Sequence, residues 1–336
     1  MTTLCDILDE RAAPTRTTLA AAPMLSVTVR AIHPLTPRIS AFELAPDGPA
    51  PFPPFTPGAH IGIDLPVHGS MVRRSYSLVN AAGQGHYEIA VLREDKGAGG
   101  SLRMHNLRVG SRLKITPPKN AFPLDDTASP ALLIAGGIGI TPILAMARAL
   151  EAAGRPYALH YATRMPEDMA YREEAGALAA ATLYFDQGDP EKGLPLDRLL
   201  AAHDGRHVYV CGPAPLIRAV LKTCTRNGWP EASVHHELFT GSLTQSGDRA
   251  FELEMRSSGI VRQVPAGMSI LDAVISEGVF APFECRRGEC GMCTTPVIEG
   301  AVDHRDHYLT DDERAAGDTM CICVSRAAGE RLVLDL

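Results

Sequence analysis

The sequence has no excess of positive charge. Its 336 residues include 32 Lys and Arg against 39 Asp and Glu, a formal net charge of −7, which argues against a nucleic-acid partner. Lysine is missing altogether from residues 250–336, where 15 acidic residues stand against 8 arginines, and the rest of the chain is balanced. The negative excess lies in this last segment, which indicates either an ordinary soluble surface or a face that docks on a basic patch of another protein.

A secretory signal and a membrane span are also missing. Three acidic residues among the first ten precede any apolar run, which does not fit a signal peptide. Residues 127–147 carry no charge over 21 positions, enough to span a bilayer, but a glycine turn at 136–139 and Pro142 interrupt them. A strand, a tight turn and a helix describe this stretch better. We expect a cytoplasmic protein that makes no membrane contact.

The eight cysteines do not form either of two common patterns. Zinc ribbons usually pair two Cys-x2-Cys knuckles, and only one such pair is present. A disulfide framework is typical of short secreted chains, whereas this chain is long and Cys5, Cys211 and Cys224 are scattered along it. Both readings are weaker alternatives to the pattern that the other cysteines form.

That pattern is Cys-x4-Cys-x2-Cys at Cys285, Cys290 and Cys293, followed by a distant cysteine, which is the plant-type [2Fe–2S] ligand spacing. Two bridged tetrahedral irons leave four coordination positions for thiolates, and the glycines inside the loop permit the positive φ angles of a tight wrap. Cys321 and Cys323 compete for the fourth position, and spacing does not separate them. Such a cluster carries one electron at a time, so the rest of the chain must supply or receive that electron.

Short β-like runs separated by Pro and Gly fill residues 25–116 and predict an antiparallel barrel or sandwich. The runs are 25–32, 38–44, 60–65, 75–79, 86–92 and 112–116. Among them, Arg74-Ser75-Tyr76-Ser77 could place Tyr76 against a ring system and Arg74 near a phosphate. Residues 96–101 precede an expected helix and could form a phosphate-binding nest. An ordinary strand and a hairpin loop would explain either feature alone, but together they predict flavin binding.

Residues 131–150 change to a strand, a glycine turn and a helix. The turn Gly136-Gly137-Ile138-Gly139 permits close approach of a pyrophosphate, although Gly-Gly-x-Gly alone is a weak indication of a dinucleotide. Buried strands follow, with helical stretches between them, at 157–162, 182–186 and 207–210. They indicate a doubly wound parallel sheet whose last strand ends in Cys211-Gly212-Pro213, at the edge where ligands bind.

After a polar, turn-rich linker, residues 250–336 predict a small α+β domain. Its expected elements are strands at 251–255 and 259–264, a helix at 269–277 and the cysteine loop.

Taken in this order, the motifs resemble the phthalate dioxygenase reductase family, within the ferredoxin–NADP reductase superfamily, over about residues 25–336. The resemblance rests on Arg74-Ser75-Tyr76-Ser77, Gly99-Gly100-Ser101, residues 120–124, 136–142, 211–213, 301–306, 323–327 and 332–336, and on the cysteine loop. It implies a multidomain fold of three domains, whereas residues 1–22, which are rich in Ala, Thr and Pro, are expected to form an N-terminal arm with no counterpart in the family. The expected ranges are 1–22 for the arm, 23–127 for an FMN-binding antiparallel β-barrel, 128–241 for an NADH-binding α/β domain with a doubly wound parallel sheet, 242–249 for the linker and 250–336 for an α+β (β-grasp) plant-type ferredoxin domain.

The resemblance also implies the residues that hold each group. Those for FMN and the nucleotide are Arg74, Ser75, Tyr76, Ser77, Val91, Leu92, Arg93, Gly99, Gly100, Ser101, Gly136, Gly137, Gly139, Thr141, Cys211, Gly212, Pro213 and Phe239. The family places its last cysteine directly before Val-Ser-Arg-Ala, which favours Cys323 over Cys321 as the fourth ligand beside Cys285, Cys290 and Cys293. Ala98 departs from the family, where relatives often have arginine, and leaves the phosphate charge to Arg74, Arg93 or Lys96.

The implied reaction passes a hydride from the nicotinamide to the flavin and then single electrons to the cluster. Cys211, Glu237 and Thr141 are candidates for orienting the rings, and a buried structural thiol and a surface carboxylate are the plain alternatives for the first two. NADH is favoured over NADPH because Arg164 stands alone after the second strand of the nucleotide fold, with two acids close behind.

The expected partner is the terminal component of a Rieske-type non-haem iron oxygenase that acts on an aromatic acid, and the reductase itself is expected to be a monomer. Two alternatives stay open. One is a reductase that serves a cytochrome P450, and the other is an electron-carrier module whose flavin site is vestigial.

Overall fold

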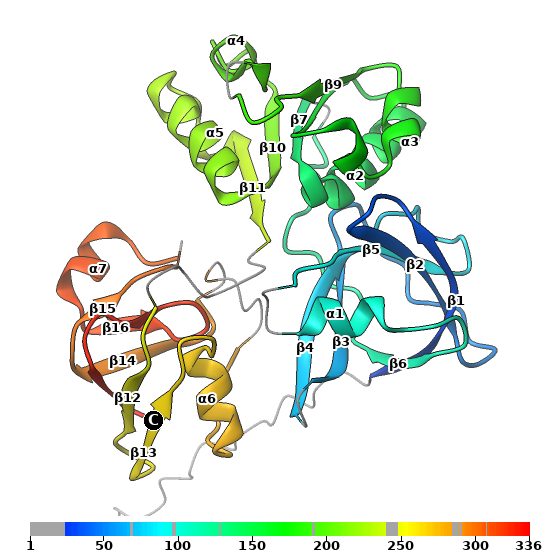
Figure 1. The fold of residues 1–336 in the computed structure, drawn as a ribbon. Coiled ribbons are helices and arrows are strands. Elements are labelled where there is room, and N and C mark those ends of the chain that lie inside the picture. The colour runs from blue at the N-terminus through cyan, green and yellow to red at the C-terminus, as the bar shows by residue number, and fades with distance from the viewer. Residues whose placement is uncertain are drawn as a thin grey trace, which may run out of the picture.

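The computed structural model describes residues 24–67, 70–95, 99–127, 129–189, 192–239, 248–283, 288, 291–306 and 308–336. The expected N-terminal arm, Lys96, Ala98 and the first two cysteines of the loop, Cys285 and Cys290, lie outside these ranges. The helices and strands form three groups in chain order, each around its own sheet (Figure 1).

The barrel domain is built from six antiparallel strands in the order β4-β3-β6-β1-β2-β5. The elements are β1 (Leu25–Pro34), β2 (Ile39–Pro46), β3 (His60–Val67), β4 (Ser70–Ser77), β5 (Tyr87–Leu92), α1 (Gly100–His105) and β6 (Arg112–Ile115). An isolated antiparallel bridge between Leu78 and Ile89 brings the end of β4 beside β5 and nearly closes the barrel. Alternating apolar residues fill it, and Val27, Val29 and Ile63 are fully buried, which confirms the strand prediction.

The parallel-sheet domain has five parallel strands in the order β11-β10-β7-β8-β9. Its elements are β7 (Ala131–Gly136), η1 (Gly137–Gly139), α2 (Ile140–Ala152), β8 (Tyr157–Thr163), η2 (Pro166–Asp168), α3 (Arg172–Ala177), β9 (Ala181–Phe185), α4 (Leu196–Leu199), β10 (His207–Gly212), α5 (Ala214–Arg226), η4 (Glu231–Ser233) and β11 (Val234–Leu238). The strand order reverses between β7 and β10, and in open α/β sheets ligands bind at such a switch point.

Both faces of this sheet are covered, which explains the continuous apolar run of β7. Leu133 and Ala135 pack with α2 on one face, whereas Leu132 and Ile134 pack with α5 on the other. The helix α2 takes up much of the uncharged stretch but has only 13 residues. Within the described ranges, no helix is both long and apolar enough to cross a membrane.

The C-terminal domain has a mixed sheet in the order β13-β12-β18-β14-β16, with β12 and β18 parallel. Its elements are β12 (Phe251–Met255), β13 (Ile260–Val264), α6 (Ile270–Ser276), β14 (Thr294–Glu299), β15 (Val302–Asp303), α7 (Asp311–Ala316), β16 (Thr319–Cys321), β17 (Arg326–Ala327) and β18 (Arg331–Leu334). The helix α6 begins where the Ser269 hydroxyl accepts a hydrogen bond from the Asp272 amide, 3.0 Å away. The multidomain fold of barrel, parallel sheet and α+β domain is therefore as predicted.

The barrel and the parallel-sheet domain share one core. Val79 and Ala90 of the barrel belong to the same buried cluster as Ile140 and Leu144 of α2, and Figure 1 shows β5 directly below α2. Across this contact the Tyr171 hydroxyl donates to Oε1 of Glu88 over 2.7 Å. Because the contact combines apolar burial with a part-buried hydrogen bond, it fixes how the two domains face each other.

Replacing Tyr171 by phenylalanine should lower the free energy of unfolding by about 1.5–3 kcal/mol at neutral pH, the usual effect of removing a hydrogen bond to a charged group. Burial and the Glu88 carboxylate raise the pKa of Tyr171, so the folded state keeps its proton. That stability is complete below the unfolded pKa of about 10 and is lost as the pH rises above it, by up to about 1.4 kcal/mol per pH unit. Urea unfolding at several pH values measures this effect. The difference in free energy of unfolding between wild type and Tyr171→Phe should become smaller above a pH of about 10. A constant gap would contradict the prediction.

Candidate functional site

The two features that suggested a flavin phosphate meet in space. A Cβ atom on Gly100 would lie 2.9 Å from Cγ and 3.1 Å from Nε of Arg74, so the Arg74 side chain crosses the start of α1. Gly99 precedes this helix with φ 83°, a left-handed conformation that favours glycine. The strand β5 is therefore followed by the helix α1 and not by a second hairpin strand, and the start of this helix lies beside the Arg74 guanidinium.

Only one of the three cations considered for the phosphate is left available among the described residues. Arg93 forms an ion pair with Asp95, with 3.0 Å between Nε and Oδ1. Lys96 lies outside the described ranges. Within the described ranges, Arg74 bonds a main-chain carbonyl, that of Arg73 at 2.9 Å, and forms no ion pair with a carboxylate, so its positive charge is available to an anion.

The strand β4 supplies further polar groups beside Arg74. Ser75 is exposed, Tyr76 is half-buried and Ser77 is buried. Burial raises the pKa of Tyr76, with a smaller contribution from Glu94, while Arg74 opposes the shift; the phenol therefore stays neutral. The hydroxyl oxygen of Ser77 is buried and has no hydrogen-bond partner among the described residues. A buried hydroxyl without a partner is costly, and a polar ligand edge would satisfy it.

On β5, the predicted residues Val91 and Leu92 lie where that strand meets α1. The carbonyl of Val91 lies 2.9 Å from Nε2 of His105, and the backbone amide of Arg93 donates to the Arg38 carbonyl over 2.7 Å. Ser101 accepts a hydrogen bond at its hydroxyl from the Glu94 amide, 3.0 Å away. The bonds of Val91 to His105 and of Glu94 to Ser101 hold the end of β5 beside α1.

The glycine turn and the Cys211-Gly212-Pro213 turn pack against each other at the switch point of the parallel sheet. A Cβ atom on Gly139 would lie 2.3 Å from the carbonyl oxygen of Cys211, and one on Gly136 would lie 2.9 Å from Cδ of Pro213. Gly137 has φ 53°. Glycine at these positions permits the close backbone approach, so the two turns meet at the carboxyl ends of β7 and β10.

Thr141 is buried in the first turn of α2, where its hydroxyl donates to the Ile138 carbonyl over 3.2 Å. It stabilises the glycine turn. Ile140, directly before Thr141 in α2, belongs to the core that the two domains share. Phe239, directly after β11, packs against the same core.

Cys211 and Glu237 are neighbours across β10 and β11, directly opposite each other in the parallel register. Their exposed fractions are 0% and 1%. The plain alternative of a surface carboxylate for Glu237 is therefore wrong, because β11, which the sequence analysis did not identify as a strand, carries this residue into the interior.

Three thiols gather in the C-terminal domain. Cys293 precedes β14, and its sulfur lies within hydrogen-bonding reach of the thiols of Cys321 and Cys323 and of the Cys323 amide. All three are buried. Within the described ranges, no three His, Cys, Asp or Glu side chains form a complete metal site, and two of the predicted ligands, Cys285 and Cys290, lie outside those ranges.

The loop glycines are positioned as a tight wrap requires. Gly288 and Gly291 have φ 74° and 69°. A Cβ atom on Gly288 would lie 2.8 Å from Cα of Asp306, and one on Gly291 would lie 2.2 Å from the ring of Tyr308. The Asp306 backbone and the Tyr308 ring therefore pack directly against these two glycines. The residue types present fit four thiolates around a compact inorganic core.

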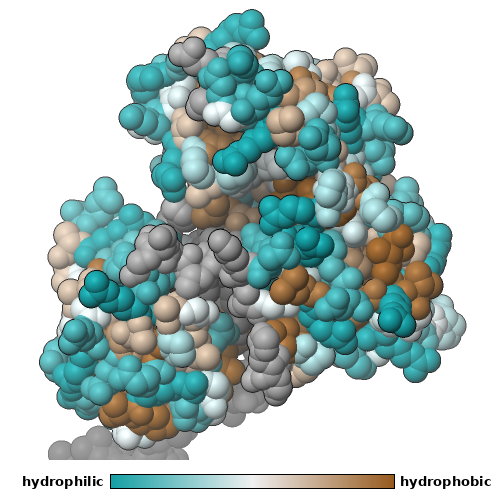
Figure 2. Space-filling model, viewed as in Figure 1, coloured by the Kyte–Doolittle hydropathy of each residue, from teal (hydrophilic) through white to brown (hydrophobic). Residues whose placement is uncertain are grey.

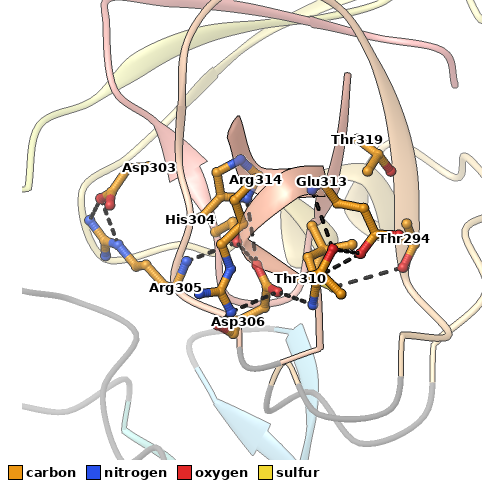
Figure 3. A network of polar contacts seen from close by, with 12 residues as sticks. Thr294, Asp303, His304, Arg305, Asp306, Thr310, Glu313, Arg314 and Thr319 are labelled. Carbon is orange, nitrogen blue, oxygen red and sulfur yellow. Dashed lines mark hydrogen bonds and ion pairs between the residues drawn. The ribbon is translucent and has the colours of Figure 1, made fainter. Parts of the chain in front are cut away.

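Asp306 organises this support (Figure 3). Its fully buried carboxylate accepts hydrogen bonds from the Ser325 hydroxyl at 3.1 Å and from the Leu309 amide at 2.9 Å, and Arg314 donates to its carbonyl over 2.7 Å. Ser325 follows Cys323 by two residues, so Asp306 ties the segment of the last cysteine to the back of the loop. Asp306 lies in the 301–306 motif, but that motif assigns it no role, and the sequence does not show which residues it contacts.

Comparisons with known proteins agree with this geometry. Residues 254–328 match the family model of the 2Fe-2S iron-sulfur cluster binding domain, and residues 133–222 match that of the oxidoreductase NAD-binding domain. Vanillate O-demethylase oxidoreductase of Pseudomonas sp. (strain HR199) is 40% identical over 93% of this chain and 100% of its own length.

Two solved structures extend the comparison. A phthalate dioxygenase reductase, described as modular for electron transfer from pyridine nucleotides to [2Fe-2S], is 37% identical with a TM-score of 0.81 and covers 93% of this chain and 98% of that one. A type IV self-sufficient cytochrome P450 monooxygenase is 36% identical with a TM-score of 0.66; the match covers 93% of this chain but 41% of that one.

These matches confirm the prediction of an oxidoreductase that uses FMN, NADH and a [2Fe–2S] cluster and serves a terminal oxygenase. The match to the phthalate dioxygenase reductase structure spans all three domains of this chain. The chain belongs to the phthalate dioxygenase reductase family.

Proposed function

We propose that this chain is the NADH-dependent reductase of a Rieske-type non-haem iron oxygenase that acts on an aromatic acid. The observation that carries the proposal is that one chain holds three separate sites in sequence. They are the Arg74 side chain across the start of α1, the glycine turns that meet at the ends of β7 and β10, and the three buried thiols of the C-terminal domain. The names of the matched vanillate and phthalate enzymes support an aromatic substrate for the partner.

When bound, FMN would take up a hydride and the cluster would carry single electrons. Arg74 and the amides at the start of α1 bind the flavin phosphate, and the Ser77 hydroxyl bonds the polar edge of the ring. Tyr76, half-buried beside Arg74, packs on the ring. Thr141 is buried in the first turn of α2, and Phe239 packs against the core that the barrel and the parallel-sheet domain share. Both residues keep the flavin site of the barrel aligned with the nucleotide site of the parallel-sheet domain.

The open position of the turn is Gly137, where an added Cβ atom would meet nothing within 4 Å, and the pyrophosphate of the nucleotide binds there, at the carboxyl end of β7. Cys211 and Glu237, paired at the carboxyl ends of their strands, orient the nicotinamide. NADH is favoured because Arg164 is exposed directly after β8, beside the exposed acids Glu167 and Asp168, which disfavour a 2′-phosphate.

For the cluster, we propose Cys285, Cys290, Cys293 and Cys323 as ligands. The protein acts as a monomer, and its C-terminal domain docks on the oxygenase through an acidic surface. Hydrophilic residues cover α7 and much of this domain in the view of Figure 2. The first turn of α7 carries Asp311, Asp312 and Glu313, whereas its arginine, Arg314, is bonded to Asp306.

A cytochrome P450 is the second candidate for the acceptor. The observation in its favour is the match to a self-sufficient P450 over 93% of this chain. Reconstitution of the purified reductase with a Rieske oxygenase and, separately, with a P450 distinguishes the two. Product formation with the P450 alone would overturn the proposed partner.

The function itself is tested by anaerobic titration of the purified chain with NADH. Visible spectra should show flavin bands together with broad cluster absorption, and NADH should bleach both, with NADPH much less effective. A cluster spectrum without flavin, or a flavin that does not respond to NADH, would instead favour the electron-carrier module.

Arg74→Ala should weaken FMN binding by about 1.5–3 kcal/mol, or roughly tenfold to a hundredfold in Kd, because the phosphate loses a charge-assisted hydrogen bond. Fluorescence titration of the flavin-free protein with FMN measures this change. Arg73→Ala is the matched control, since Arg73 is the adjacent arginine but already forms an ion pair with Asp64 at 2.7 Å. Equal losses in the two variants would show that general charge, and not the Arg74 site, holds the phosphate.

A further inference from the structure

The C-terminal domain holds one thiol more than a [2Fe–2S] cluster needs. Cys293 has two cysteine neighbours, Cys321 and Cys323, while four ligands in total complete the cluster. Residues 250–336 contain five cysteines. With Cys285 and Cys290 as two of the four ligands, one of these three buried cysteines is not a ligand, and its side chain is a thiol beside a metal-bound sulfur. Such an S–H group, held next to a thiolate in a dry core, is in a position to act on the cluster without binding iron.

The backbone gives Cys321 and Cys323 different places. Cys321 is the last residue of β16 and pairs with Thr294 on β14. Cys323 lies in the turn that follows, which closes on the Cys321 carbonyl through the amides of Val324 at 3.2 Å and Ser325 at 3.0 Å. Cys321 is thus held by the sheet, whereas Cys323 stands at the turn that the Asp306 network ties to the cysteine loop.

The hydrogen bonds around Cys321 indicate which way its proton points. The Thr294 hydroxyl donates to the Gly291 carbonyl over 2.5 Å, so its hydrogen is engaged, and its oxygen lies 3.8 Å from the Cys321 sulfur. The S–H group of Cys321 is consequently a donor, shared between that oxygen and the sulfur of Cys293. A metal-bound thiolate is the stronger acceptor of the two because it carries negative charge.

We propose that Cys321 is not a ligand but a hydrogen-bond donor to Sγ of the ligand Cys293, and that this bond raises the reduction potential of the cluster. Reduction adds negative charge to the cluster sulfurs, and a donor stabilises the reduced form more than the oxidised one. The buried surroundings strengthen the effect, since Cys293 and Cys321 lie in the core of the domain. This inference rests on the proposed function, which makes Cys293 and Cys323 ligands.

The test uses the full-length holoprotein and the variants Cys321→Ala and Cys321→Ser. Redox titration followed by EPR and visible absorption gives the midpoint potential, and iron analysis gives the cluster content. Cys321→Ala should keep its cluster and shift the reduction equilibrium about tenfold toward the oxidised form, which for one electron is about 59 mV. Cys321→Ser, which keeps a donor, should recover part of that shift.

Cys224→Ala is the matched control, because Cys224 is another buried thiol but lies in α5 of the parallel-sheet domain. The midpoint potential of the cluster in this variant should equal that in the wild type. An unchanged midpoint potential in Cys321→Ala would overturn this inference but leave the proposed function standing. Loss of the cluster in Cys321→Ala with retention in Cys323→Ser would overturn it by making Cys321 the ligand. A wild-type chain without a [2Fe–2S] EPR signal would overturn the proposed function and the inference with it.

Discussion

Replacing Cys293 by serine is expected to abolish electron delivery to the terminal oxygenase while NADH-dependent reduction of ferricyanide by the flavin stays close to the wild-type rate. Cys293 is 3% exposed, and its sulfur reaches the thiols of Cys321 and Cys323, the other two cysteines of this domain that lie within the described ranges. Serine offers a hard oxygen where the cluster needs a soft thiolate. Substituting partners that only support a metal ligand already costs about 10–100-fold, so loss of the ligand itself should reduce transfer by at least about that factor.

The barrel and the parallel-sheet domain have cores that do not include Cys293, which is why ferricyanide reduction should survive. Oxygenase-coupled turnover and ferricyanide reduction are measured on the same preparation, with iron content as a check. Cys224→Ser serves as the control for replacing a buried thiol and should retain both activities. If Cys293→Ser loses both activities equally, the division of labour between flavin and cluster is wrong.

The strands were largely predictable because their side-chain periods are strong. The barrel strands alternate, and β7 is apolar throughout because helices cover both faces of its sheet. The strand β11 was missed because its sequence, Val-His-His-Glu-Leu, is polar at the centre. It is a strand because β10 offers it a parallel edge, a tertiary cause that no local pattern reveals.

Within the candidate site, the sequence located the glycine turns and the cysteines, since these residues are needed by type. It could not show that Arg74 lies across Gly100 or that Gly139 touches Cys211, because these contacts join segments far apart in the chain. Asp306 belongs to one of the motifs that carry the family resemblance, but the motif assigns it no role. Its function as a buried acceptor depends on Ser325 and Leu309, and such partners become visible only after folding.

Gly139→Ala is expected to lower kcat/KM for NADH about 100-fold while FMN and iron content remain those of wild type. The added Cβ would lie 2.3 Å from the carbonyl oxygen of Cys211 and 2.6 Å from the Gly212 amide nitrogen. Both are backbone atoms, so no side-chain rotation relieves the clash and the two turns must separate. A shift of about 1 Å in a group that positions a substrate can cost about 100-fold in rate.

The same clash should destabilise the parallel-sheet domain by about 1–3 kcal/mol, as inserting a methyl group into a filled space does. Gly176→Ala is the matched control in this domain: it lies in α3, and its added Cβ would meet only a Leu183 methyl at 3.6 Å. That variant should keep full activity and gain up to about 1 kcal/mol from better helix propensity. Steady-state NADH oxidation with ferricyanide and thermal unfolding test both variants. Normal NADH kinetics in a destabilised Gly139→Ala would mean that the packing of the two turns at the ends of β7 and β10 does not position the nucleotide.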